Sequence, residues 1–427
     1  MLSRDSRSDR RESGRLAALD GLRGLAALAV LLHHSLLLDP AFPASPQDGS
    51  VEPGSAIWWL SYTPLKLLSA GWESVVVFFV LSGLVVTLPV MQKPHFDWIA
   101  FYPRRIVRLL VPVIASVLVA AAFVVAIPQV PAQSGGWLKN SSTPTFSWEM
   151  VVQAWDLVGG DGQINNPLWS LRWELLFSLA LPVFVLVALV LRRWWIAGLV
   201  GAVLVTWLGV RTGSGALSYF PAFFVGALMA ARLDDIRQFS SRINRLSLRH
   251  LVWFGMTLAA AMLLIVTWLA WPLSAGLGEL TPALKALAPV AAAGLVLSCI
   301  GWRPFGALLS RRPFQFVGKI SFSVYLVHVP ILIFSGYLFQ GEPVVIPMAF
   351  GIGLTLVVAV CFSWLVEQRS HGWARSAGTW ASARYAAMLG EGTERSADVP
   401  TRNRDLNRDL VRGQREVATP AQPSRAS

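Results

Sequence analysis

The sequence predicts an all-α protein, a polytopic bundle of about ten transmembrane helices with both termini in the cytoplasm. Hydrophobic residues make up 54% of the 427 residues and charged residues only 14%, whereas soluble domains carry about 25% charged residues. The apolar residues are gathered in stretches of roughly twenty, the length that crosses a hydrocarbon core of about 30 Å. Nineteen Trp supply the amphipathic rings that gather at membrane–water interfaces. We therefore expect a multi-pass protein of the cell membrane.

The apolar stretches follow one another along the chain. The fourth and fifth are separated only by Arg192 and Arg193, and the sixth is short and contains Gly and Pro. Longer connections, rich in Pro, Gly, Ser and Trp, follow the first and third stretches. In chain order the expected spans are 16–38, 72–91, 106–127, 168–191, 194–210, 216–231, 251–273, 283–302, 317–339 and 344–366.

Basic residues indicate the orientation of these spans. With the N-terminus inside, the inner connections carry the Arg-containing segments 104–108, 232–249 and 303–319, while the outer connections carry mainly Asp and Glu. An excess of Lys and Arg on the cytoplasmic side is the usual rule for membrane proteins. The net charge of +12 is therefore explained by topology, and we expect a lipid bilayer and no nucleic acid as partner.

The sequence divides into three regions, a cytoplasmic tail at 1–15, a transmembrane domain at 16–367 and a cytoplasmic tail at 368–427. The second tail is rich in Arg, Ser, Ala and Pro and is expected to be mostly disordered, with a short surface helix at 380–389. No cleaved signal peptide is expected, because no short apolar segment with a small-residue cleavage site follows the polar start. Cys299 and Cys361 lie in apolar stretches, so we expect neither a disulfide nor a metal site.

Ionisable residues in the first apolar stretch indicate a functional site, because an ionisable group inside a membrane costs at least a few kcal/mol. A helix turns about 100° per residue, so the steps from Arg23 to His34 return to within about 20° of one direction, about 16 Å along the axis. Asp20 lies on nearly the same face, and His33 points about 80° away. We expect His34 to act with Arg23 and His33 to be a bystander. The structural alternative is an Asp20–Arg23 ion pair, with His34 in a polar contact.

Two further pairs of charged residues are candidates. Arg172 and Glu174 are two residues apart and face different ways on a helix. Glu174 is therefore a candidate acid, base or hydroxyl-orienting group, or one half of a structural ion pair with another span. Arg105 and Arg108 share a face near a helix N-terminus, which suits an anion, although basic residues at this depth also serve as topology anchors.

Polar residues in two other spans complete the candidates. Ser321, Tyr325 and His328 recur at helical spacing and form one polar stripe, which fits hydrogen-bonded packing as well as function. Ser82 and Gly83 suit close packing of helices.

Five motifs in chain order resemble those of the type 3 integral-membrane acyltransferase family. The resemblance covers nearly the whole apolar body, 19–367. Members of that family O-acylate surface polysaccharides, lipopolysaccharide, peptidoglycan and some secreted metabolites. The motifs are Leu-Asp-Gly-Leu-Arg at 19–23 with a His eleven residues after the Arg, Phe-Phe-Val-Leu-Ser-Gly at 78–83, Arg-Arg-x-x-Arg at 104–108, Leu-Trp-Ser-Leu-x-x-Glu at 168–174 and Ile-Ser-x-Ser-x-Tyr-Leu-x-His at 320–328.

The resemblance implies a membrane O-acyltransferase. Its donor would be cytoplasmic acyl-CoA, with acetyl-CoA expected first, and its acceptor a hydroxyl of an exported carbohydrate or other cell-envelope molecule. No metal is expected. The resemblance implies that His34 is the catalytic histidine, supported by Arg23, and that Arg105 and Arg108 help to hold the donor. Together with the polar residues described above, the expected catalytic residues are His34 as general base, Arg23 and Glu174. The expected donor-binding residues are Arg105 and Arg108, and the expected substrate-binding residues are Asp20, Ser82, Tyr325 and His328.

The chain departs from the family pattern at two places. Leu175 and Leu176 stand where a second acid and a Gln are usual, and Glu367-Gln368-Arg369 replaces a Glu-Lys-Pro or Glu-Arg-Pro run. These departures leave the acceptor and the role of Glu367 open. We also expect no fused extracytoplasmic hydrolase-like domain of the kind that some members carry.

Two other functional classes compete with an enzyme. In a transporter or flippase the same buried charges would line a substrate path, and inverted repeats would relate two halves of the chain. No convincing internal repeat is found. A non-catalytic scaffold would leave Arg23, His34 and Glu174 without an explanation.

Overall fold

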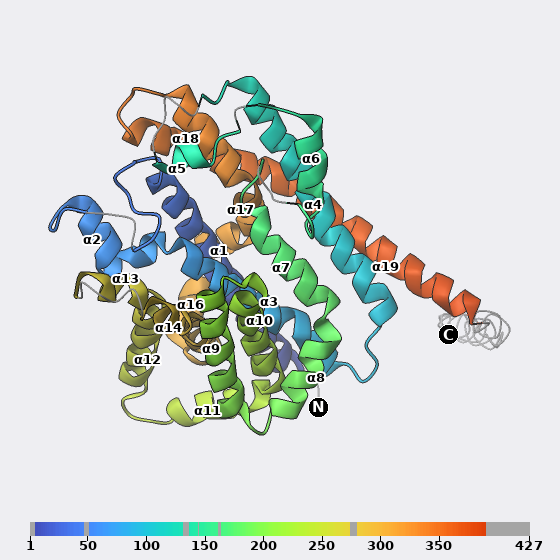
Figure 1. Cartoon of the computed structure of the whole chain (residues 1–427). Coiled ribbons are helices and arrows are strands. Elements are labelled where there is room, and N and C mark those ends of the chain that lie inside the picture. Colours follow the sequence, from blue (N-terminus) through green and yellow to red (C-terminus); the bar gives the residue numbers. More distant parts are fainter. Residues whose placement is uncertain are drawn as a thin grey trace, which may run out of the picture.

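The structure is a computed structural model that describes residues 5–46, 51–130, 136–143, 145–160, 164–273 and 280–389. Within these ranges the regular elements are all helices, with no strand, which confirms the all-α prediction. Figure 1 shows the helices gathered into one bundle. The longer ones are α1 (Asp5–Leu36), α3 (Gly71–Gln92), α4 (Trp98–Ala126), α7 (Leu168–Leu179), α8 (Leu181–Leu191), α9 (Trp195–Thr212), α10 (Gly215–Ala231), α11 (Leu233–Ile243), α12 (Arg249–Leu264), α15 (Ala288–Gly301), α17 (Arg312–Leu338), α18 (Val345–Phe362) and α19 (Gln368–Met388).

Short helices lie in the connections. They are α2 (Ala56–Tyr62), η1 (Pro64–Ser69), α5 (Gly136–Asn140), α6 (Trp148–Trp155), α13 (Val266–Ala270), η3 (Trp271–Leu273), α14 (Thr281–Lys285) and α16 (Arg303–Leu309), together with a π-helical segment, Ser363–Glu367, between α18 and α19.

Six helical segments of the described chain are long and apolar enough to cross a membrane, or up to eight if each of two bent helix pairs counts as one span. The protein is therefore a multi-pass membrane protein, as predicted. The predicted span 168–191 is not straight, since α7 and α8 meet at an angle of 70°. The break falls at Ala180, and Pro182 at the start of α8 lacks the backbone N–H that would continue the hydrogen bonds of α7. The count of ten spans and the cytoplasmic location of both termini stay predictions.

Small residues allow the central helices to approach closely. A Cβ added at Gly24 of α1 would lie 2.7 Å from the backbone nitrogen of Gly318 in α17. A Cβ added at Gly83 of α3 would lie 2.1 Å from the carbonyl oxygen of Phe223 in α10. Small residues at such crossings bring backbones together in membranes, which confirms the packing predicted for Gly83. As a result α1 packs closely on α17, and α3 packs closely on α10.

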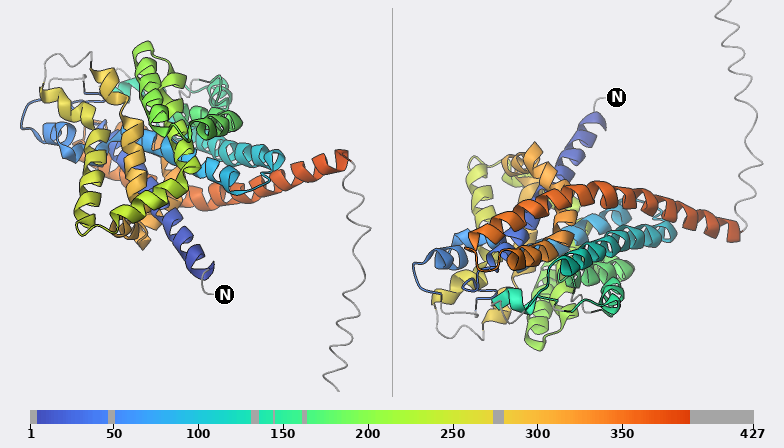
Figure 2. Two further views of the ribbon diagram at one scale, coloured as in Figure 1. Left: turned by 90° about the horizontal axis from the view of Figure 1, so that it is seen from below. Right: turned by 90° about the horizontal axis from the view of Figure 1, so that it is seen from above.

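The described residues after 367 form a long helix, whereas the sequence predicted a mostly disordered tail. The short helix expected at 380–389 is part of α19, which runs along α4 and beyond the bundle (Figure 2). Ser370, Ala374 and Gly378 are buried at four-residue spacing, so α19 presents a face of small residues to α4. Residues 390–427 of the predicted tail lie outside the described residues.

Asp97 fastens the far part of α19 to the start of α4. Its carboxylate accepts a hydrogen bond from the Ser382 hydroxyl at 2.7 Å and one from the backbone N–H of Ala100 at 2.8 Å, as the N-cap of α4. Both hydrogen bonds favour the ionised carboxylate and lower the pKa of Asp97 from its ordinary value, the Ser382 contact more strongly. This tie holds a segment that the composition alone predicted to be mostly disordered.

Candidate active site

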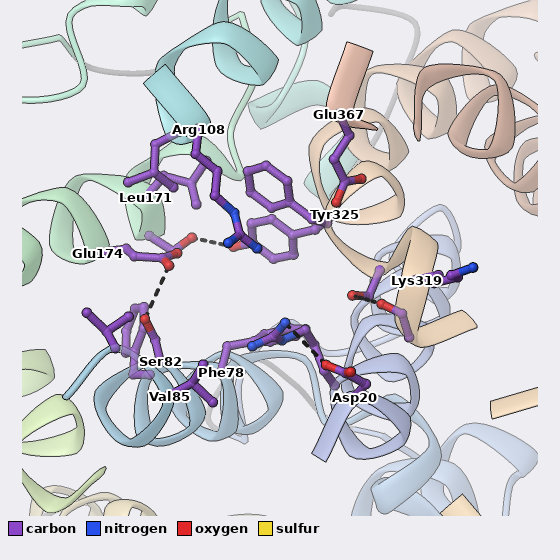
Figure 3. A pocket seen from close by; sticks show the side chains of 18 of the residues that line it. Asp20, Phe78, Ser82, Val85, Arg108, Leu171, Glu174, Lys319, Tyr325 and Glu367 are labelled. Atoms are coloured by element: carbon purple, nitrogen blue, oxygen red, sulfur yellow. Dashed lines mark hydrogen bonds and ion pairs between the residues drawn. The ribbon is translucent and has the colours of Figure 1, made fainter. Parts of the chain in front are cut away.

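A cavity of about 680 Å³ lies between α1, α3, α4, α7 and α17. Side chains from all five helices line it, and Figure 3 labels ten of the lining residues. The cavity gathers most of the residues that the sequence singled out, although they come from segments far apart in the chain. The predicted site residues that line it are Asp20, Arg23, Ser82, Arg105, Arg108, Glu174 and Tyr325.

Glu174 is held in the cavity wall by an ion pair with α4. The distance from Arg105 Nη2 to Glu174 Oε1 is 2.5 Å, and the Ser82 hydroxyl donates to the same carboxylate oxygen at 3.2 Å. Arg105 also donates to the Ser178 hydroxyl at 3.0 Å through Nε. Arg172 faces a different hollow, as the two-residue spacing predicted. The contacts of Arg105 therefore orient its guanidinium and balance much of its charge.

Arg108 differs from Arg105 in having no such partner. It is exposed and lines the cavity, and none of the described residues gives it a hydrogen bond or an ion pair within 4.0 Å. Arg23 is 3.7 Å from Asp20 in an i,i+3 pair whose side chains are 31% and 53% exposed, and a pair so exposed stabilises little. Both guanidinium groups can therefore interact with a ligand in the cavity.

The cavity has an excess of positive charge. Its cations are Arg23, Arg105, Arg108, Arg312 and Lys319, and its carboxylates are Asp20, Glu174 and Glu367. A concave site lined by more cations than anions focuses positive potential and concentrates anionic ligands. The sequence interpretation missed Arg312 and Lys319, although their spacing of seven residues puts them on one face of α17.

Glu367 is a functional candidate whose role the sequence left open. Its Oε2 atom accepts a hydrogen bond from the Ser323 hydroxyl at 2.5 Å, and the side chain points into the cavity from the π-helical segment (Figure 3). The ninth-span motif contains Ser323, so the motif and the Glu at the end of the apolar body meet in space. No single stretch of sequence could indicate this pairing.

His34 and His328 do not line the cavity. Their rings contact each other, with His328 Nε2 3.2 Å from His34 Nδ1 and ring centroids 4.9 Å apart. His34 Nδ1 also lies 3.0 Å from the Val30 carbonyl oxygen, and His328 Nδ1 lies 2.8 Å from the Tyr325 carbonyl oxygen. His33, the predicted bystander, is buried and makes no contact of this kind with His328.

These contacts assign the tautomers of the two neutral rings. A carbonyl oxygen only accepts, so each Nδ1 carries the proton. His328 Nε2 then has a free lone pair and accepts a hydrogen bond from the Nδ1–H of His34. The Val30 carbonyl oxygen accepts from the same N–H. The remaining nitrogen, His34 Nε2, bears a lone pair. In this arrangement Nε2 of His34 is an oriented basic atom, and His328 is the hydrogen-bond acceptor of the His34 Nδ1–H.

Tyr325 connects the histidine pair to the cavity. It lines the cavity and its hydroxyl lies 2.6 Å from the Ser170 hydroxyl, while its ring centroid is 5.7 Å from that of His328. On the other side, the Trp137 ring centroid is 5.6 Å from that of His34. The histidine pair therefore lies just behind the cavity wall. Among the described residues, no group of three or more His, Cys, Asp or Glu side chains could hold a metal ion.

A comparison with protein families identifies the group to which this arrangement belongs. A family model described as an acyltransferase domain matches residues 16–367. The chain belongs to the acyltransferase 3 family. The match includes every candidate residue named above and confirms the resemblance drawn from the five motifs.

Individual relatives of this acyltransferase family member are distant. The O-acetyltransferase OatA of Staphylococcus aureus (strain NCTC 8325 / PS 47) is 24% identical over 374 residues, which cover 81% of this chain and 55% of the relative. The O-acetyltransferase PaAT-1 of Phomopsis amygdali is 26% identical over 384 residues, which cover 74% of this chain and 71% of the relative. The chain thus spans about half the length of the staphylococcal relatives that it matches. No solved structure matches it.

Proposed function

We propose that this protein is a membrane O-acyltransferase that moves an acyl group, acetyl in the first instance, from acyl-CoA to a hydroxyl of an exported acceptor. The observation that carries the proposal is the oriented, unprotonated Nε2 of His34 just behind a cavity with excess positive charge. The family and the two relatives named as O-acetyltransferases support the same reaction class.

The cations of the cavity suit the phosphates of CoA. Arg108 and Arg23 are the guanidinium groups least engaged with the protein, and guanidinium forks bind phosphate oxygens in pairs. The continuous helix α1 separates Arg23 from His34 by about 16 Å. The extended pantetheine arm of CoA would bridge this length, with the thioester past Tyr325. Arg23 is therefore assigned to the donor end and not to the reacting carbonyl.

In the proposed reaction His34 is the general base. Its Nε2 takes the proton of the acceptor hydroxyl while the hydroxyl oxygen attacks the thioester carbonyl carbon. The tetrahedral intermediate then expels the CoA sulfur as the carbon–sulfur bond breaks, and the sulfur takes the proton back from His34. During these steps the imidazolium Nδ1–H keeps its acceptor, His328 Nε2. Glu174 holds Arg105 and does not reach the reacting atoms.

Labelled acetyl-CoA and purified protein in liposomes test the proposal. His34→Ala should lower acyl transfer by a factor of about a hundred to ten thousand, the usual contribution of a general base, and Arg23→Ala should raise the KM for acetyl-CoA. His95→Ala, at an exposed position outside the cavity, is the matched control and should behave as the wild type. Unchanged transfer by His34→Ala would exclude this base, and movement of an unmodified substrate without thioester consumption would favour a transporter.

A further inference from the structure

A second group of polar side chains is buried at the other end of α1 and has no role in the steps above. His33 of α1, Lys66 and Ser69 of η1 and Glu73 of α3 are all less than one-tenth exposed. Lys66 interacts electrostatically with both His33 and Glu73, and the backbone of Ser69 hydrogen-bonds with His33, so the four residues share one region. We call it the Lys66–Glu73 cluster.

Each member of the cluster has a polar atom without a hydrogen-bond partner. These atoms are His33 Nδ1, Lys66 Nζ, Ser69 Oγ and Glu73 Oε2. A buried polar atom left without a partner costs about 1–3 kcal/mol, and more if it is charged. Since four such atoms in one place would be a heavy penalty for the fold, the cluster needs groups that donate and accept hydrogen bonds.

The charges of Lys66 and Glu73 are kept apart by one indole ring. Lys66 Nζ lies 3.5 Å from the centroid of the Trp268 ring, and Trp268 Nε1 donates to Glu73 Oε1 at 2.9 Å. The two side chains form no ion pair within 4.0 Å in the described residues. A buried cation and a buried carboxylate would ordinarily pair. Here the face of the Trp268 ring contacts the Lys66 ammonium, and its N–H hydrogen-bonds one carboxylate oxygen of Glu73. The second carboxylate oxygen of Glu73 is left available.

The cluster lies at the His34 end of α1, and the cavity extends along α1 toward Arg23. His33 is next to His34, with ring centroids 5.2 Å apart. On α1, Arg23 of the cavity lies about 16 Å from His34, and on α3, Glu73 lies about 14 Å from Ser82 of the cavity. η1 packs on α1, α2 packs on η1 and α13 packs on α2, away from the N-terminus (Figure 1). A donor bound at Arg23 and an acceptor bound at the cluster would thus both reach His34.

We propose that the Lys66–Glu73 cluster is the acceptor subsite and that it binds the hydroxyl groups of a carbohydrate. This proposal rests on the proposed acyltransferase function. One hydroxyl would donate to Glu73 Oε2, and its neighbour would accept from Lys66 Nζ. One cation and one carboxylate together favour a neutral ligand over a charged one. The rings of Trp268, Phe42 and Tyr62 supply apolar walls against which a sugar ring can lie.

The polar atoms of the cluster are enclosed in this structure. A carbohydrate therefore reaches them only when the covering segment, α2 with η1, moves away from α13. The hydroxyl bound there would be delivered next to His33, and hence close to the base on the following residue.

Binding of a neutral oligosaccharide tests the subsite without any acyl transfer. Saturation-transfer NMR would use maltotriose with the full chain in lipid nanodiscs. The wild type should transfer saturation to the sugar protons, and Lys66→Met and Glu73→Gln should each reduce the signal at least fivefold. Lys139→Met, at an exposed lysine of α5, is the matched control and should keep the signal. No signal with the wild type, or equal signals in all four proteins, would overturn the proposal.

Acyl transfer from labelled acetyl-CoA to maltotriose gives the second readout. Lys66→Met and Glu73→Gln should raise the KM for maltotriose at least tenfold while the KM for acetyl-CoA stays within twofold of the wild type. A parallel rise of both KM values would assign the cluster a structural role and refute the subsite. If maltotriose binds in a Lys66-dependent way but acetyl-CoA is never consumed, the proposed function fails and the carbohydrate site stands.

Discussion

Replacing His328 with leucine removes the acceptor that the Nδ1–H of His34 uses and leaves the cavity lining unchanged. The Val30 carbonyl, 3.0 Å from the same nitrogen, still accepts from His34, so the substitution leaves no buried donor without a partner. Leucine also fills a similar volume in this fully buried position. We therefore expect His328→Leu to accumulate in membranes like the wild type.

The expected loss follows from the charge that His34 would gain in the proposed reaction. A hydrogen bond to a charged group contributes about 1.5–3 kcal/mol, and every 1.36 kcal/mol of barrier changes a rate tenfold. Losing the contact between His34 Nδ1 and His328 Nε2, 3.2 Å apart, should lower kcat by a factor of about 10 to 150. The KM for acetyl-CoA should stay unchanged, because His328 does not line the cavity.

The assay is acyl transfer from labelled acetyl-CoA by purified protein in liposomes, with His328→Gln as the matched variant. The side-chain oxygen of Gln can accept where Nε2 of His328 does, so this variant should recover most of the lost kcat. The reasoning would be refuted if His328→Leu retained a kcat within twofold of the wild type. It would also be refuted if the Gln variant were as impaired as the Leu variant.

Three other perturbations have definite expected outcomes. Arg108→Gln should raise the KM for acetyl-CoA about tenfold, the equivalent of one charged hydrogen bond, whereas Arg104→Gln, outside the cavity lining, should leave this KM within twofold. Gly83→Ala should lower the stability measured by thermal unfolding in detergent by about 1–3 kcal/mol, because its Cβ would meet backbone; Gly201→Ala, with open space around it, should raise stability by about 0.5–1 kcal/mol. Burial lowers the pKa of Lys66 from 10.5 to about 8, so between these pH values the folded protein has released a proton that the unfolded chain still binds. Its unfolding free energy should therefore rise by roughly 3 kcal/mol between these pH values, and a Lys66→Met variant that shows the same rise would contradict this origin.

The site was largely predictable where its residues belong to short motifs. Asp20 and Arg23 share one helix face, which the period of 3.6 residues gives without any tertiary information. The same period separated His34 from His33, and in the structure it is His34 that lies within hydrogen-bond distance of His328. A helix fixes the relative directions of its own side chains, so this part of the prediction needed only the helix itself.

The missed features have a common physical origin in contacts between distant segments. Glu73 and Trp268 are 195 residues apart and meet through one hydrogen bond. Lys66 lies in a connection that the sequence predicts to be an outer loop, yet its side chain is fully buried. The helical face of α19 depends on three small residues that pack on α4, and composition counted such residues as favouring disorder.

The amino-acid sequence by itself determined the helical class, the membrane location and the family, because hydrophobic content, stretch length and motif order are properties of the chain alone. It also determined which polar residues share a face within each helix. Only the tertiary structure decided that Arg105 pairs with Glu174, that His328 orients His34, and that Lys66 and Glu73 are held apart. These relations depend on how closely helices from distant parts of the chain pack, and no local pattern of residues specifies that distance.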